Sequence, residues 1–214
     1  MISDAALADI CLGSYAKGYQ WDWKALSKLG VWVAIKRVGD LDVVCFRGSV
    51  TIDDWIRDLV AVPETVNHPE LGPLHAGFAK GMQDVTDLVR WGLRPEVTYA
   101  VTGHSLGAAR AWIFAGMMLK VRMPSRVCVF GSPRPGFARL AAALAAPGII
   151  SMVSYRNATP IGHDRVTDLP PAFPPELPWC QPVALTDIAE PPDPADLSPF
   201  RFHHMALYGK GMGA

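Results

Sequence analysis

Residues 97–119 read VTYAVTGHSLGAARAWIFAGMML, and this stretch predicts the centre of the fold. A β-branched and aromatic run at 97–101 leads into GHSLG at 103–107, and an Ala-rich apolar run of about four helical turns follows. A strand, Gly-x-Ser-x-Gly and a helix in this order predict a nucleophile elbow, a sharp turn that exposes a serine hydroxyl at the end of a central strand. We therefore expect Ser105 to be a nucleophile.

The residues around Ser105 fit the same interpretation. The turn strains the backbone of the serine, and Gly103 and Gly107 lack the Cβ atoms that would collide with the adjoining strand and helix. The N–H of Leu106, in the first turn of the helix, is expected to point to where an oxyanion forms. His104 is expected to pack or to bond nearby backbone.

Composition limits the classes of function. The chain has 214 residues, enough for one domain with a packed core, and half of them are apolar. Twenty Lys and Arg residues balance twenty Asp and Glu residues, so no basic excess favours nucleic acid as a partner. The four cysteines lie far apart, without the spacing of a metal site.

Targeting signals are equally sparse. The first residues, MISD, lack the basic region and apolar core of a signal peptide. No apolar run approaches a membrane span free of charges and helix breakers. These features predict a cytoplasmic protein without a transmembrane segment, although export by another route leaves the same pattern.

The remaining hydrophobic patterns predict strands and helices that alternate around a mainly parallel sheet, as in an α/β fold. The expected elements are helices at 3–12, 75–92 and 137–146, a strand hairpin at 31–38 and 41–46, strands at 127–130 and 149–155, and a loop at 63–73. Residues 169–199 contain ten prolines, which predicts an irregular loop lying on the same domain, residues 1–214.

Residues 51–61 (TIDDWIRDLVA) predict a short amphipathic helix. Apolar side chains recur at helical spacing, and acidic side chains and an arginine occupy the other face. The main apolar positions are Ile52, Trp55, Ile56 and Leu59. A helix of this kind usually covers a core.

A serine hydroxyl becomes a nucleophile when a histidine accepts its proton and a carboxylate orients that histidine. In folds with this elbow, the acid and then the base follow the serine along the chain. The candidate bases are His203 and His204, the only histidines after residue 163. The candidate acids after the 149–155 strand are Asp164 and Asp168. Further aspartates lie in the Pro-rich stretch: Asp187, Asp193 and Asp196.

An oxyanion hole also needs a second donor besides the N–H of Leu106, normally from a loop that follows an earlier strand. The sequence FRGS at 46–49 fits this requirement, because an apolar strand ends there in a glycine and a small hydroxyl residue. Ser49 is expected to donate through its N–H and its Oγ.

In all these motifs the sequence resembles the class 3 (fungal-type) lipases, a branch of the α/β-hydrolases. The matching motifs are FRGS at 46–49, DWxxDL at 54–59, HxGF at 75–78, VTGHSLG at 101–107, FGSPR at 130–134, DxVxxLP at 164–170 and HxMxxY at 203–208. The resemblance implies an α/β-hydrolase fold and the hydrolysis of carboxylic esters, most of all acylglycerols or other lipid esters. It also implies an acyl-enzyme intermediate and no cofactor or metal. The implied partner is an ester or lipid substrate, with a lipid–water interface as a candidate setting.

The resemblance also implies roles for individual residues. It makes Ser105 the nucleophile, Asp164 the triad acid and His203 the base. The implied oxyanion donors are Ser49 and Leu106. In this family the helix after the oxyanion serine is a lid, here residues 50–60, whose apolar face would contact lipid. A short, fixed cover is the alternative.

Two departures from the family pattern bear on the triad. A small insertion at 158–162 precedes Asp164, so Asp168 stays an alternative acid. His204 adjoins His203, and only the spacing of the last motif selects the first of the two. Two other functions would use the same fold: acyl transfer to an alcohol or amine, or ligand or protein binding by a catalytically silent domain.

Overall fold

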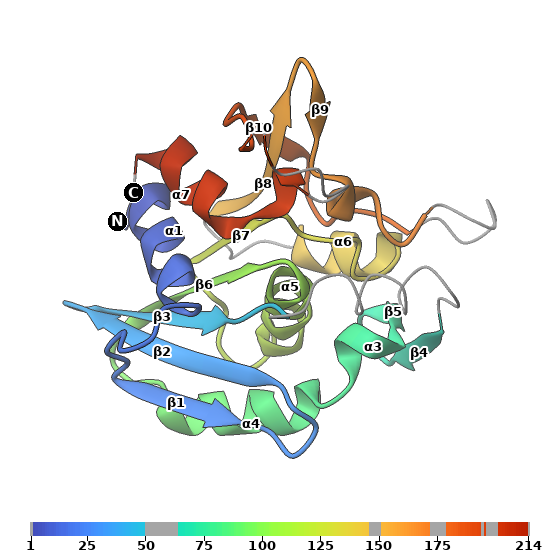
Figure 1. The fold of residues 1–214 in the computed structure, drawn as a ribbon. Coiled ribbons are helices and arrows are strands. Elements are labelled where there is room, and N and C mark those ends of the chain that lie inside the picture. Colours follow the sequence, from blue (N-terminus) through green and yellow to red (C-terminus); the bar gives the residue numbers. More distant parts are fainter. Residues whose placement is uncertain are drawn as a thin grey trace.

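The computed structural model describes residues 2–49, 64–145, 151–171, 179–193, 195 and 201–213. Its centre is a sheet with the strand order β1-β2-β3-β6-β7-β8-β10, in which β9 pairs with β8 (Figure 1). The strands are β1 (Trp23–Leu26), β2 (Trp32–Val38), β3 (Leu41–Phe46), β6 (Thr98–His104), β7 (Arg126–Phe130), β8 (Ser151–Thr159), β9 (Gly162–His163) and β10 (Leu185–Ile188). From β3 to β10 neighbouring strands run parallel, whereas β1, β2 and β3 are antiparallel. The predicted α/β fold with a mostly parallel sheet is confirmed.

Helices cover both faces of this sheet (Figure 1). On one face α1 (Asp4–Gly13) and α7 (Met205–Met212) pack beside each other, and on the other lie α4 (Met82–Gly92), α5 (Leu106–Met118) and α6 (Ala138–Leu144). Successive strand residues point into opposite cores: Val44 and Val101 face α5, whereas Val43 and Ala100 face α1. Because the central strands are buried on both faces, they read as continuous apolar runs.

Two of the predicted elements follow directly from local chemistry. The Oγ of Ser3 accepts a hydrogen bond from the N–H of Ala6 at 3.2 Å and so caps α1, the helix predicted at 3–12. The predicted hairpin is β2–β3, and Gly39 in its turn has a φ of +56°, a conformation that favours glycine.

Three expectations need correction. The segment at 63–73 is not all loop, because β4 (Thr65–His68) and β5 (Gly72–His75) form a hairpin whose first strand is mostly exposed. The helix expected at 75–92 is divided into α3 (Ala76–Ala79) and α4, since Gly81 has a φ of +77°. Within the Pro-rich stretch, β10 extends the central sheet.

Two findings concern membranes and lids. None of the helices in the described ranges is both long and apolar enough to cross a bilayer. The helix predicted at 51–61, with Ile52, Trp55, Ile56 and Leu59, lies outside the described residues.

Candidate active site

Ser105 lies in the turn between β6 and α5, as the sequence predicts. Its φ of 59° is the one positive value among the described non-glycine residues, and its side chain is fully buried. A Cβ on Gly103 would lie 2.5 Å from the backbone oxygen of Gly107, and one on Gly107 would collide with the backbone oxygen of Phe46. Both glycines are therefore required for the close approach of β3, β6 and α5.

Asp164 and His203 form a buried acid–base pair. The Nδ1 of His203, the last residue of the 3₁₀ helix η2 (Arg201–His203), lies 2.6 Å from Oδ2 of Asp164. Both side chains are fully buried. Oδ1 of Asp164 accepts the N–H of Val166 at 2.9 Å and so caps the 3₁₀ helix η1 (Arg165–Asp168). The pair has the geometry in which a carboxylate orients an imidazole.

Tyr208 on α7 supplies a further donor to the same carboxylate. Its Oη donates to Oδ2 of Asp164 at 2.5 Å and accepts the N–H of Asn157 at 3.1 Å. Burial and the neighbouring carboxylate raise the pKa of Tyr208 well above its usual value, so the hydroxyl keeps its proton. Sequence reasoning used Tyr208 only for motif spacing and missed this contact.

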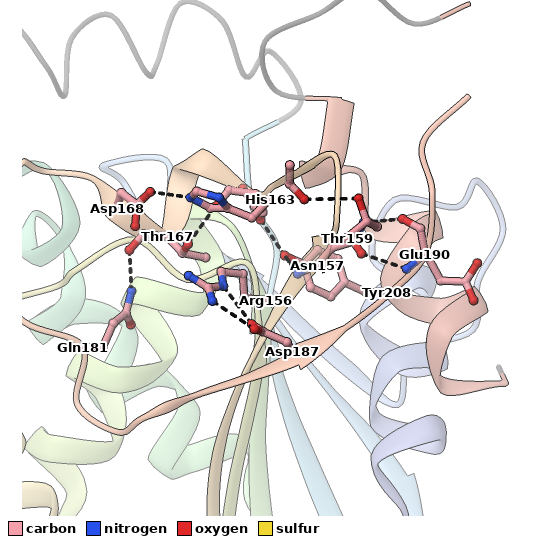
Figure 2. Close-up of polar contacts among 12 residues, drawn as sticks. Arg156, Asn157, Thr159, His163, Thr167, Asp168, Gln181, Asp187, Glu190 and Tyr208 are labelled. Atoms are coloured by element: carbon pink, nitrogen blue, oxygen red, sulfur yellow. Dashed lines mark hydrogen bonds and ion pairs between the residues drawn. The ribbon is translucent and has the colours of Figure 1, made fainter. Parts of the chain in front are cut away.

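The alternative acids lie in other pairs. Asp168 is half exposed and its Oδ2 lies 2.8 Å from Nε2 of His163, and Asp187 binds Arg156 through two contacts of 2.8 and 3.0 Å (Figure 2). Asp193 accepts the N–H of Ala195. The last alternative, Asp196, lies outside the described residues. The structure therefore brings Asp164 to the base, and none of the other described aspartates.

The insertion expected at 158–162 is the β8–β9 hairpin. Ala158 pairs with His163, and the N–H of Asp164 returns to the backbone oxygen of Asn157 at 2.8 Å. The hairpin thus adds residues without displacing Asp164 from the end of β8. The structure also distinguishes the two adjacent candidate bases, because His203 is buried against Asp164 whereas His204 is exposed.

Asn157 fixes the segment that carries His203. Its buried amide donates to the backbone oxygen of Glu190 at 2.9 Å, and its Oδ1 accepts the N–H of Glu190 at 3.0 Å (Figure 2). The amide also donates to the backbone oxygen of Phe202 at 3.4 Å. The residue before the base is therefore tied to β8 and to the chain after β10. Sequence reasoning missed this role, because the partners are 33 and 45 residues away.

The end of β7, at Phe130 and Gly131, adjoins both Ser105 and His203. The N–H of Ser105 donates to the backbone oxygen of Phe130 at 3.0 Å, and a Cβ on Gly131 would lie 2.8 Å from the ring of His203. Among the described residues, Ser105 Oγ and His203 Nε2 are buried atoms without a hydrogen-bond partner. The hydrogen bond between nucleophile and base is thus not made in this state; such bonds often tighten only when substrate is bound.

The loop with Ser49 packs directly on the elbow. A Cβ on Gly48 would lie 3.1 Å from Cβ of Ser105 and 2.6 Å from the backbone oxygen of His104. Ser49 follows and is half-buried, and Leu106 begins α5, where an N–H has no partner within the helix. Leu106 therefore adjoins the nucleophile in the chain, and Ser49 directly follows the glycine that packs on the elbow.

Metal ligands are not clustered in the part of the chain that the structure describes. No group of three or more His, Cys, Asp or Glu side chains in these ranges is arranged to hold a metal ion. The described cysteines are all free thiols, and three of them are buried in the core.

The fold and the order of serine, aspartate and histidine define an α/β-hydrolase. Residues 43–173 match the sequence profile of the family described as lipase (class 3), and the chain belongs to this family. The crystal structure of a lipase from Rhizopus microsporus var. chinensis superposes with a TM-score of 0.67 at 23% identity, covering 88% of this chain and 72% of that one. The predicted family and the predicted α/β-hydrolase fold are confirmed.

Two relatives extend the comparison. A lipase from Rhizomucor miehei is 34% identical over 142 residues, which cover 60% of this chain and 37% of the relative. The secreted mono- and diacylglycerol lipase 1 of Fusarium solani is 29% identical over 114 residues, 50% of this chain and 34% of the relative. The chain therefore spans about a third of the length of either relative.

The prediction of a cytoplasmic location is wrong. The relative from Fusarium solani is named a secreted lipase, which contradicts it. The prediction was based on missing targeting and membrane-span features, and the absence of such features from a stretch of sequence does not establish the compartment in which a domain works.

Proposed function

We propose that this chain hydrolyses carboxylic esters, with acylglycerols or other lipid esters as its substrate class, through an acyl-enzyme intermediate. The observation that carries the proposal is the buried contact of 2.6 Å between Asp164 and His203, next to a serine at a strained elbow. Membership of the class 3 lipase family and the names of the two relatives support the substrate class.

In the first half of the reaction, Oγ of Ser105 attacks the ester carbonyl carbon and Nε2 of His203 takes the hydroxyl proton. Asp164 accepts the Nδ1–H of His203, keeps Nε2 free to act as a base, and stabilises the imidazolium that forms. The N–H of Leu106 and the N–H and Oγ of Ser49 stabilise the oxyanion. His203 then gives its proton to the departing alcohol, which leaves the acyl group on the serine.

The second half repeats these steps with water. His203 takes a proton from the water as it attacks the acyl-enzyme, the oxyanion forms again beside Leu106 and Ser49, and the proton returns to Oγ of Ser105. The products are a carboxylic acid and the free enzyme. This chain's own side chains supply every proton transfer.

The decisive experiment compares wild type with Ser105→Ala on p-nitrophenyl esters from acetyl to oleoyl. We expect Ser105→Ala to lower kcat by about 10³-fold or more, because the nucleophile is lost. Ser125→Ala is the matched control, since its Oγ bonds the backbone oxygen of Tyr99 at the opposite end of the sheet. Near-normal turnover by Ser105→Ala would reject the proposal.

Two further measurements on the wild-type protein distinguish ester hydrolysis from the two rival functions. An acyltransferase gives mainly transfer product when an alcohol competes with water, whereas a hydrolase gives mainly free acid. A catalytically silent domain leaves Ser105 unlabelled by a fluorophosphonate probe.

From the sequence we also propose that the apolar positions of residues 50–60 bind lipid: Ile52, Trp55, Ile56 and Leu59. A lid of this kind predicts a jump in rate as the substrate concentration crosses its micellar threshold. A smooth saturation curve through that threshold would contradict it.

We propose that residues 1–214 form one α/β-hydrolase domain. The support comes from the Pro-rich stretch at 169–199, whose described part contributes β10 to the central sheet beside β8. Limited proteolysis tests this, since a separate unit would be released by cleavage within 169–184.

A further inference from the structure

His104, the residue before the nucleophile, is buried between the elbow and the base, with 2% of its surface exposed. Its ring stacks on that of His203, with centroids 4.6 Å apart and planes inclined by 28°. Its Nε2 lies 2.8 Å from the backbone oxygen of His203, and its Nδ1 lies 2.9 Å from Oη of Tyr15. That hydroxyl is also 3.1 Å from the N–H of Gly48. A chain of three hydrogen bonds therefore links the base to the loop that carries Ser49.

Elementary chemistry fixes the direction of each bond. A carbonyl oxygen only accepts hydrogen bonds, so Nε2 of His104 carries a proton and donates a hydrogen bond to the backbone oxygen of His203. Burial and the neighbouring His203 lower the pKa of His104 well below its ordinary value, so the ring is neutral and Nδ1 accepts. Burial raises the pKa of Tyr15, so its hydroxyl stays protonated, donates to Nδ1 and accepts the N–H of Gly48. Each group in the chain thus has one defined role.

We propose that His104 and Tyr15 are positioning residues that hold the base and the oxyanion loop at a fixed distance from each other. The inference rests on the proposed ester hydrolysis and names residues to which that function assigns no role. Tyr15 follows α1, Gly48 follows β3 and His203 ends η2, so the three segments are far apart in the sequence. These hydrogen bonds join the segments directly, and a displacement of about 1 Å between reacting groups can cost a hundredfold in rate.

Two features of the site fit this role. A Cβ on Gly48 would collide with the hydroxyl of Tyr15, so only glycine lets the loop reach the hydrogen-bonded chain. During the reaction His203 becomes an imidazolium whose ring lies against that of His104. A second positive charge there would oppose this step, whereas the neutral ring of His104 permits it.

The test removes one hydroxyl at a time. Tyr15→Phe leaves the N–H of Gly48 and Nδ1 of His104 unpaired. Tyr99→Phe is the control, because Tyr99 is a buried residue near the start of β6, away from the elbow, and its hydroxyl also donates a hydrogen bond, to the backbone oxygen of Arg122. We expect both variants to lower Tm by similar amounts, but only Tyr15→Phe to lower kcat, by about tenfold, with KM for a short soluble ester changed by less than about twofold.

The two positioning residues should also act as a unit. His104→Phe keeps the ring and loses both hydrogen bonds, so we expect Tyr15→Phe combined with it to cost no more than His104→Phe alone. His104→Gln retains one donor and one acceptor and should recover part of the loss. Additive losses in the double variant would contradict a continuous chain.

A nitrogen-15 NMR spectrum of the histidine rings gives a readout that needs no turnover. It should show His104 neutral, with its proton on Nε2, from about pH 5 to 8. A proton on Nδ1 overturns the inference whether or not the protein is active. Equal kcat values for Tyr15→Phe and Tyr99→Phe overturn it in an active enzyme, whereas a wild type that hydrolyses no ester overturns the proposed function instead.

Discussion

Replacing Asp164 by asparagine keeps the size of the side chain but turns one of its two acceptor oxygens into an NH₂ donor. Three donors aim at the carboxylate: Nδ1–H of His203 at 2.6 Å and Oη–H of Tyr208 at 2.5 Å on Oδ2, and the N–H of Val166 at 2.9 Å on Oδ1. An amide offers one acceptor oxygen and one NH₂ group. In either orientation the NH₂ group therefore faces at least one donor.

The less costly orientation keeps the amide oxygen on Val166, because a backbone N–H cannot become an acceptor. The hydroxyl of Tyr208 can turn, and the imidazole of His203 can change tautomer so that Nδ1 accepts. Its proton then sits on Nε2, where it prevents the base from taking the proton of Ser105. We expect kcat to fall by about 10⁴-fold, equivalent to about 5.5 kcal/mol at 1.36 kcal/mol per tenfold.

The assay is steady-state hydrolysis of p-nitrophenyl butyrate, with the rate of fluorophosphonate labelling as a second measure of the nucleophile. Asp168→Asn is the matched control, since this half-exposed acid pairs with His163 and not with the base. We expect the kcat of Asp168→Asn to stay within about twofold of the wild-type value. A loss of less than tenfold in Asp164→Asn, or an equal loss in Asp168→Asn, would refute the assignment of the acid.

Three further predictions address the oxyanion loop, the elbow and the pH dependence of stability. Ser49→Ala should lower kcat for the same ester by about 10²-fold through the loss of Oγ as a donor, and an unchanged rate would remove Ser49 from the site. Gly107→Ala should lower the free energy of unfolding in urea by about 1–3 kcal/mol or more, because its Cβ collides with the backbone of Phe46. Gly209→Ala in α7 should instead raise that free energy by about 0.5–1 kcal/mol, because the added Cβ would make an ordinary contact of 3.7 Å with Leu12. Equal effects of the two changes would count against the close approach at the elbow. Burial lowers the pKa of His75 from 6.5 to about 4, so the unfolded chain binds this proton first and stability falls as pH drops from about 6.5 to 4. His75→Asn keeps an acceptor for the N–H of Gly77. In urea titrations, the free energy of unfolding of this variant should fall by roughly 1–3 kcal/mol less than that of wild type between pH 7 and 4.5. An identical fall in both proteins would exclude His75 as a source of the pH dependence.

Elements whose cause is local could be predicted from the sequence. The elbow, the cap at Ser3 and the hairpin turn at Gly39 each depend on residues within a few positions of one another. The β4–β5 hairpin could not, because its first strand is exposed and carries no apolar alternation. The break before α4 was also missed, since a helical pattern of apolar residues continues across Gly81.

The choice between neighbouring candidates needed the tertiary structure. Asp164 and Asp168 follow the same strand, and His203 adjoins His204, so sequence spacing separates them only weakly. In the folded chain the β8–β9 hairpin returns Asp164 to the end of β8, and η2 turns His203 inward against it. A contact between residues 39 positions apart depends on how the whole chain packs.

By itself the sequence determined the α/β class, the strained serine and the family, because each can be identified from short motifs and hydrophobic patterns that do not require knowledge of long-range contacts. Only the tertiary structure decided which carboxylate meets which imidazole, and that Tyr15, His104 and Gly48 are joined by hydrogen bonds. Such bonds form between groups brought within about 3 Å by the packing of distant segments, and that distance is a property of the fold.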